Sequence, residues 1–237
     1  MSATLLILRP EPGASETAAR AAALGLCATV APIFTIRPLP WQAPNPSEFD
    51  AVLLTSANAA RHAGGDLARF AGLPCYAVGP ATAAAAIAAG FASVRNGADD
   101  GAAAAAMMAD RHVARALHLC GRDRMPLRGG PVSIEDVPVY AAEAADALPA
   151  AAREAIVAGA VALLHSPRAA RLFAALADRA GLARDTIALV AISEAAAAAA
   201  GGGWKSRLTA ARPRDHALLE LAAKLCQNGD AATSVGG

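Results

Sequence analysis

The feature that most constrains the fold is an internal repeat. Residues 53–61 (LLTSANAAR) recur as residues 163–171 (LLHSPRAAR), and residues 76–81 recur less closely as residues 190–195. The two copies lie about 110 residues apart, so both matches belong to one repeated unit. Each copy has a short apolar run, then a small polar residue, then an alanine-rich stretch. This order is typical of a strand that leads into a helix, and it indicates two copies of one α/β unit.

Apolar runs alternate with alanine-rich stretches along the rest of the chain. This alternation is typical of a parallel sheet that is covered by helices. We expect strands near residues 5–8, 51–55, 75–78, 117–120, 161–165 and 187–192. We expect helices near residues 15–24, 57–63, 81–89, 102–109, 168–180, 195–200 and 216–226.

About fifty residues precede the first copy of the repeat, and they are too few to form a domain alone. We therefore expect them to complete the lobe that the C-terminal copy forms, with the working site in the cleft between two lobes. The predicted parts are residues 1–35 with 143–228 as a discontinuous lobe 1, 46–135 as an inserted lobe 2, 36–45 and 136–142 as linker strands, and 229–237 as a disordered tail.

Two extended segments that contain proline, residues 36–40 and 137–140, are expected to carry the crossings between the lobes. Proline cannot donate a backbone hydrogen bond to a neighbouring strand. Such strands therefore suit an exposed edge or a two-stranded linker better than the centre of a sheet.

Composition excludes several classes of protein. The formal net charge is +1, whereas a nucleic-acid-binding protein usually has a basic domain or stripe. The four cysteines are scattered without metal-ligand spacing, which predicts free thiols in a reducing compartment and no metal site. The N-terminal run lacks a charged region before it, and the longest apolar run is too short to span a bilayer. We expect a cytoplasmic monomer that binds neither nucleic acid nor membrane.

Sequence motifs do not identify an enzyme, because GxGxxG, Walker A, HExxH and GxSxG are all absent. His165 ends an apolar run and is expected to be structural. Small polar residues recur where a strand should end and a helix begin: Thr55, Ser56, Gly79, Gly121, Ser166 and Ser193. These residues either cap helices or bind an anionic ligand, since ligands of open α/β sheets bind at the carboxyl ends of the strands.

Five ordered strings together resemble the uroporphyrinogen-III synthase family. They are residues 8–10 (LRP), 54–59 (LTSANA), 76–83 (YAVGPATA), 137–140 (VPVY) and 165–170 (HSPRAA), and the likeness extends to about residue 225. The resemblance implies two flavodoxin-like parallel-sheet lobes, the first of them split in sequence, joined by a two-stranded linker.

The resemblance also implies a reaction. Hydroxymethylbilane, a linear tetrapyrrole with eight carboxylates, loses water and closes to uroporphyrinogen III with inversion of ring D, without a cofactor. Tyr140 matches the family tyrosine that is proposed to help the hydroxyl leave, and a protonated phenol can donate there. Hydroxymethylbilane synthase, the preceding enzyme, would be a transient partner.

By motif position, the resemblance gives candidate substrate contacts that can hydrogen-bond or pair with carboxylates. They are Arg9, Thr55, Ser56, Asn58, Gly79, Thr82, Gly121, Arg122, Ser166, Arg168 and Ser193. The chain departs from the family pattern at Ala196, where many members have threonine, and at Glu194, whose charge would oppose an anionic ligand.

Two other functions remain open at this point. One is a two-lobed module that binds an anionic ligand without catalysis, which stable binding without turnover would indicate. The other is a two-lobed nucleotide-sugar transferase, for which the chain is short and which nucleotide binding would indicate.

Overall fold

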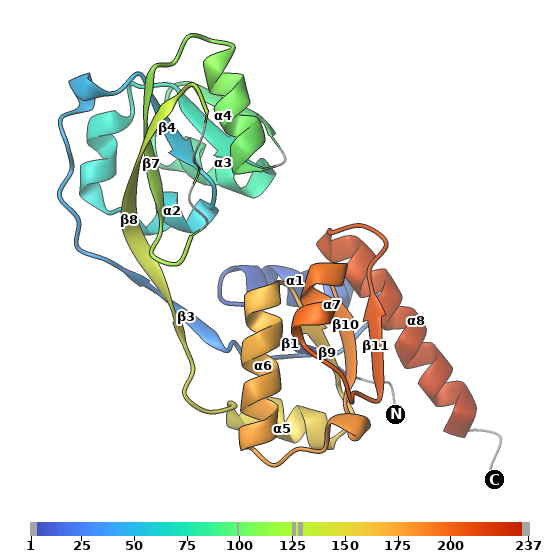
Figure 1. Ribbon diagram of the computed structural model, residues 1–237. Coiled ribbons are helices and arrows are strands. Elements are labelled where there is room, and N and C mark those ends of the chain that lie inside the picture. Colours follow the sequence, from blue (N-terminus) through green and yellow to red (C-terminus); the bar gives the residue numbers. More distant parts are fainter. Residues whose placement is uncertain (1–3, 99, 125–126, 128–129, 234–237) are drawn as a thin grey trace. The chain divides into compact units, whose positions relative to one another are not determined.

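The computed structural model describes residues 4–98, 100–124, 127 and 130–233. They form two compact units, each around its own β-sheet (Figure 1). Unit 1 contains the chain up to residue 35 and from residue 144 on, and unit 2 contains residues 36–143. In the described part of the chain, no helix is both long and apolar enough to cross a membrane.

The sheet of unit 1 has five parallel strands in the order β11-β10-β9-β1-β2. They are β1 (Leu5–Ile7), β2 (Ala28–Val30), β9 (Val161–Leu164), β10 (Ala188–Ala191) and β11 (Ser206–Thr209). The N-terminal strands thus lie beside strands from the far end of the chain. Residues of β1 and β9 are almost wholly buried, which explains why these strands are continuous apolar runs.

Helices cover both faces of this sheet. They are α1 (Gly13–Ala23), α5 (Ala150–Val157), α6 (Pro167–Arg179), α7 (Glu194–Ala199) and α8 (Asp215–Thr233). One core joins α1 and α8 to the sheet through residues such as Ala21, Leu163 and Leu218. Helices α5, α6 and α7 pack against the strands as well (Figure 1). The arrangement is a doubly wound α/β sheet.

The sheet of unit 2 has six strands in the order β3-β8-β7-β4-β5-β6. They are β3 (Phe34–Pro38), β4 (Ala51–Leu54), β5 (Cys75–Val78), β6 (Val94–Ala98), β7 (Arg115–Gly121) and β8 (Ser133–Ala144). The strands from β8 to β6 are parallel. Strand β3 runs antiparallel to β8, because Leu39 bonds to Val139 while Ile33 bonds to Ala145.

Helices α2 (Ala57–His62), α3 (Pro80–Ala88) and α4 (Gly101–Ala109) cover the sheet of unit 2, together with 3₁₀ turns at Pro46–Glu48 and Gly65–Phe70. A third 3₁₀ turn, Arg184–Thr186, precedes β10 in unit 1. One core of unit 2 contains Leu54, Phe70 and Leu117, and a second contains Leu53, Tyr76 and Met108. Alternate residues of β4 thus belong to different cores, as expected for a strand covered on both faces.

The two sheets share one spatial design. Strands β4, β5, β6, β7 and β8 occupy the positions in unit 2 that β9, β10, β11, β1 and β2 occupy in unit 1. The repeat found in the sequence is therefore a pair of equivalent strand–helix units, and the order of elements is circularly permuted between them. The strand order reverses between β1 and β9 in unit 1 and between β4 and β7 in unit 2, and ligands of such sheets bind at this switch point.

The structure differs from the sequence prediction in several places. Helix α8 spans Asp215–Thr233, so it overlaps the tail 229–237 for which we predict disorder; that prediction stays a prediction, and residues 234–237 lie outside the described residues. Of the predicted linker strands, residues 36–38 belong to β3 and residues 136–142 belong to β8, both in the sheet of unit 2, while residues 39–45 follow β3 outside the sheet. Pro138 lies in β8, which has a strand on each side, and the register of β7 and β8 shifts beside it. This irregularity accommodates a residue that cannot donate to a ladder.

Candidate active site

A pocket of about 280 Å³ lies at the switch point of unit 2. It is lined by residues that follow β4, residues at the end of β7, Tyr140 of β8 and the start of α4. The lining residues are Thr55, Ser56, Gly101, His118, Gly121, Asp123, Arg124, Leu127 and Tyr140. Four of the predicted site residues, Thr55, Ser56, Gly121 and Tyr140, are thus brought together although 85 residues separate the first from the last.

Gly121 determines where the ring of Tyr140 lies. The two residues are register partners in β7 and β8, and the backbone N–H of Arg122 donates to the carbonyl of Tyr140 at 2.8 Å. A β-carbon on Gly121 would lie 2.9 Å from Cζ of Tyr140 and 3.0 Å from its hydroxyl oxygen. The missing side chain of Gly121 therefore admits the phenol to the pocket wall, and the ring of His62 flanks it at 6.4 Å between centroids.

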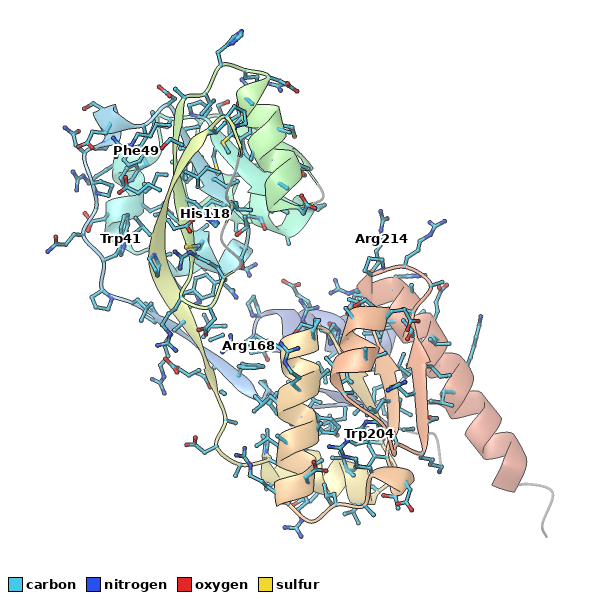
Figure 2. All side chains as sticks on the ribbon, in the orientation of Figure 1. Trp41, Phe49, His118, Arg168, Trp204 and Arg214 are labelled. Atoms are coloured by element: carbon cyan, nitrogen blue, oxygen red, sulfur yellow. The ribbon has the colours of Figure 1, made fainter. Side chains whose placement is uncertain are left out.

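A network of hydrogen bonds links Thr55, His118 and Arg124, which line the pocket, through Asp136, which is not among the lining residues. Thr55 Oγ1 lies 2.9 Å from Nε2 of His118, whose Nδ1 lies 2.7 Å from Oδ1 of Asp136. Arg124 Nε donates to the other oxygen of Asp136 at 2.9 Å. His118 is 1% exposed, and Figure 2 shows it inside unit 2.

The protonation of this chain follows from its surroundings. Burial lowers the pKa of His118 and outweighs the hydrogen bond to Asp136, so the imidazole is neutral at pH 7. Burial would raise the pKa of Asp136, but hydrogen bonds from His118 and Arg124 hold it below its usual range. The pocket wall therefore carries a guanidinium and a neutral imidazole, both bonded to the ionised carboxylate of Asp136.

His118, Cys120 and Asp136 also place one possible metal-ligand atom each within 4.8 Å of one another. Burial raises the pKa of Cys120 to about 11, so its thiol is protonated at pH 7 and is a poor ligand. The guanidinium of Arg124 already balances the charge of Asp136. The donor set therefore does not suit a cation.

The remaining candidates of unit 2 lie near these elements but are not among the residues that line the pocket, as far as the chain is described. Asn58 is in the first turn of α2, where its N–H donates to Ser56 Oγ at 3.2 Å. Gly79 precedes α3 with φ of 80°, and Thr82 is turned inward with 5% exposure. Arg122 is engaged with Glu143 at 3.1 Å, and this pairing raises the pKa of the guanidinium.

In unit 1, serines begin two helices at the carboxyl ends of strands. Ser166 Oγ accepts from the N–H of Ala169 at 3.1 Å at the start of α6, and Ser193 Oγ accepts from the N–H of Ala196 at 3.3 Å at the start of α7. Capping uses an oxygen lone pair and leaves each hydroxyl hydrogen able to donate. Arg168 lies in the first turn of α6 (Figure 2), with its guanidinium carbon 4.6 Å from the centre of the Phe34 ring.

A second network lies at the switch point of unit 1, around Asp215. His165 Nε2 lies 2.8 Å from Oδ1 of Asp215, Arg20 Nε donates to Oδ2 at 2.7 Å, and Thr17 donates at 3.0 Å. Arg9 lies 3.6 Å from the same carboxylate. Burial would raise the pKa of Asp215, but the hydrogen bonds from His165 and Arg20 hold it well below its usual range. Arg9 follows the end of β1 and is engaged with Asp215 and Thr17, while its predicted contact with substrate stays a prediction.

The two residues that depart from the family pattern, Ala196 and Glu194, both lie in the first turn of α7. Ala196 is wholly buried in α7, so its methyl group packs inside unit 1. Glu194 is the first residue of α7 and is exposed, where its charge interacts favourably with the helix start.

Sequence reasoning missed the two histidine–carboxylate pairs. His118 and Asp136 are 18 residues apart in sequence, and His165 and Asp215 are 50 apart. The available signal was a histidine within the apolar run 116–120 (ALHLC), because a polar residue inside a buried strand needs a partner.

Fold and site together define the class of this protein. It is an α/β protein with two equivalent doubly wound sheets, each with hydroxyl, imidazole and charged groups at its switch point. A family model described as "Uroporphyrinogen-III synthase HemD" matches residues 15–220. The chain therefore belongs to the uroporphyrinogen-III synthase family, whose members are cyclising lyases of haem biosynthesis.

Solved structures of this family are similar to the chain. Uroporphyrinogen-III synthetase from Helicobacter pylori matches 95% of this chain and 100% of its own, with 16% sequence identity and a TM-score of 0.64. Uroporphyrinogen III synthase from the extremely thermophilic bacterium Thermus thermophilus matches 96% of this chain and 99% of its own, with 16% identity and a TM-score of 0.43. At such identity the Helicobacter likeness shows the shared fold. No curated protein matches the chain.

Proposed function

We propose that this chain converts hydroxymethylbilane to uroporphyrinogen III, with inversion of ring D and loss of water. The observation that carries the proposal is the family match over residues 15–220. The pocket in unit 2 supports it, because a phenol, a hydroxyl pair and a guanidinium line one small cavity. The reaction needs orientation of a flexible anion and a proton for the leaving group, and these groups supply both.

In the proposed reaction, Tyr140 donates a proton to the departing hydroxyl, which leaves as water. The ring carbon that forms the new bond later loses a proton, so the overall reaction releases only water. The position of the phenol beside Gly121 supports this role, since the hydroxyl stands at the pocket wall. Arg124 lines the same pocket, and although its Nε is bonded to Asp136, its other guanidinium N–H groups can donate to a carboxylate of the substrate.

The structure supports the other proposed substrate contacts to different degrees. Ser166, Ser193 and Arg168 are supported by their positions at the first turns of α6 and α7, where helix N-termini favour carboxylates. Thr82 and Arg122 have less support, because Thr82 is turned inward and Arg122 is paired with Glu143.

We further propose that the reaction uses no cofactor or metal, in a cytoplasmic monomer that meets hydroxymethylbilane synthase transiently. Proton transfer and positioning suffice for the chemistry, which supports the first part. Incubation with EDTA is expected to leave the rate unchanged. A loss of activity that added metal restores would contradict it.

The function is tested by separating product isomers. Hydroxymethylbilane is generated in situ by its synthase, this protein is added, and the products are oxidised and separated. The proposal predicts that isomer III dominates. Isomer I alone, formed in the presence of folded protein, would refute the proposed function and would favour a binding module.

A further inference from the structure

The hydrogen-bond chain in the unit 2 pocket has a fixed direction. Asp136 is ionised, and a carboxylate can only accept hydrogen bonds. His118 Nδ1, which lies 2.7 Å from it, must therefore carry the hydrogen and donate. A neutral imidazole has one hydrogen, so Nε2 is left as an acceptor.

The direction passes on to Thr55. Nε2 of His118 lies 2.9 Å from Thr55 Oγ1, so the hydroxyl of Thr55 donates its single hydrogen to the imidazole. The oxygen of Thr55 then faces the pocket with lone pairs alone. A substrate carboxylate, which is also only an acceptor, cannot bond to it.

We propose that His118 and Asp136 are positioning residues that hold Thr55 as a hydrogen-bond acceptor in this pocket, so that Thr55 binds an N–H or O–H group of the substrate and not a carboxylate. The inference rests on the proposed function, and in a tetrapyrrole the matching donor is a pyrrole N–H. The carboxylate on the same pyrrole is left to Arg124, which lines the same pocket. Thr55 thereby binds the N–H of a pyrrole ring, and Arg124 binds a carboxylate on the same ring.

The same three groups also resemble the hydroxyl–imidazole–carboxylate arrangement of acyl-transfer enzymes. Burial lowers the pKa of His118, which makes it a weak base toward Thr55. At 1% exposure, His118 also presents almost no surface to a substrate, although it lies in the pocket wall. These features favour a positioning role over activation of a nucleophile.

The variant Asp136→Asn is expected to reverse the direction of the hydrogen bonds between residues 136, 118 and 55, because asparagine has nearly the same shape as aspartate. Arg124 donates to one oxygen of Asp136, so the amide oxygen of the asparagine is expected to stay there. The amide nitrogen then faces Nδ1 of His118 and donates to it, which shifts the imidazole hydrogen to Nε2. Nε2 now donates to Thr55, and the hydroxyl hydrogen of Thr55 turns into the pocket.

The first readout is the imidazole tautomer, measured by ¹⁵N NMR of histidine-labelled protein at pH 7. We expect His118 to carry its hydrogen on Nδ1 in the wild type and on Nε2 in Asp136→Asn. A wild-type His118 with its hydrogen on Nε2 would overturn the inference. The wild-type tautomer is measured without turnover and without a variant. Its result therefore does not depend on the proposed function or on whether a variant folds.

The second readout is kcat/KM for hydroxymethylbilane generated in situ. Loss of a matched hydrogen-bond partner is expected to lower kcat/KM by ~10- to 100-fold in Asp136→Asn and in Thr55→Val. The double variant is expected to lose clearly less than the two single losses combined, since Asp136 acts through Thr55 apart from its ion pair with Arg124. Thr55→Ser, which keeps the hydroxyl, should restore most of the activity.

The matched control is Glu135→Gln, the neighbouring residue of β8. It also replaces a carboxylate that pairs with an arginine, Arg115 at 2.7 Å, but it is outside the residues that line the pocket. Its kcat/KM should equal that of the wild type. Independent, additive losses from Asp136→Asn and Thr55→Val would overturn the inference. Failure of the wild type to form isomer III would instead refute the proposed function, while the tautomer result would remain valid.

Discussion

Replacing Gly121 by alanine tests whether the position of Tyr140 matters for turnover. The new β-carbon would lie 2.9 Å from Cζ of Tyr140, 3.0 Å from the hydroxyl oxygen and 3.1 Å from Cε2. Carbon atoms in contact prefer separations of about 3.5–4.0 Å, so the ring must move by roughly 0.5–1 Å. Alanine itself adopts the backbone conformation there, because φ of Gly121 lies outside the left-handed region.

The expected effect falls on catalysis more than on stability. A displacement of about 1 Å in a positioned catalytic group can cost ~100-fold in rate. We expect kcat of Gly121→Ala to fall by ~10- to 100-fold on this ground. The free energy of unfolding should fall by about 1 kcal/mol, the low end of overpacking costs, because Tyr140 is only partly buried and can shift.

The assay is the rate of isomer III formation, with urea unfolding as the stability measurement. Gly72→Ala is the matched control, since a β-carbon there meets nothing within 4 Å and no unusual φ is involved. In the background of Tyr140→Phe, the alanine should cause little further loss of kcat. A Gly121→Ala protein with wild-type kcat, or with a loss that adds fully to that of Tyr140→Phe, would refute the reasoning.

Two further predictions concern stability. Burial lowers the pKa of His118 and His165, so below about pH 6.5 the unfolded protein takes up protons that the folded protein does not. The free energy of unfolding, measured with urea, should therefore be lower at pH 5.5 than at pH 7.5. Equal free energies at the two pH values would contradict this prediction. Asp215→Ala leaves the donors of Arg20 and His165 without their acceptor and should destabilise the protein by about 3 kcal/mol. The control is Asp178→Ala, which removes an exposed ion pair with Arg184 and should change the free energy of unfolding little. Equal decreases in the free energy of unfolding for Asp215→Ala and Asp178→Ala would contradict the prediction.

The sequence allowed the inner strands and most helices to be predicted, because buried parallel strands must be continuous apolar runs. The equivalence of Ser56 and Ser166, expected from the repeat, is confirmed, since each caps the helix after an inner strand. The outer strands β2, β6 and β11 were missed. An outer strand pairs on one side only and stays partly exposed, so its residues need not be apolar.

Helix α5 was also missed, because its apolar end continues through Gly159 directly into β9. The run Ala155–Leu164 therefore combines the end of a helix, a turn and a strand, which hydrophobicity alone does not separate. Gly159 lies at the turn with φ of 85°, and a glycine inside this apolar run was the sequence signal for the end of the helix.

The candidate site was predictable where local sequence determines it. Thr55, Ser56 and Gly121 follow or end apolar runs, so their place at the carboxyl edge of the sheet follows from the strand pattern. The pairing of His118 with Asp136 depends instead on the register between β7 and β8, which no local pattern specifies. The charged network of Asp215 likewise depends on how α8 packs against α1.

The most direct test of the account is the kinetics of Tyr140→Phe with hydroxymethylbilane generated in situ. Loss of a proton donor to the leaving hydroxyl should lower kcat for isomer III by ~100-fold or more, with KM little changed and the circular dichroism spectrum intact. More of the substrate should then close without the enzyme to isomer I. A folded Tyr140→Phe protein with wild-type kcat would contradict the assignment of Tyr140 as the proton donor.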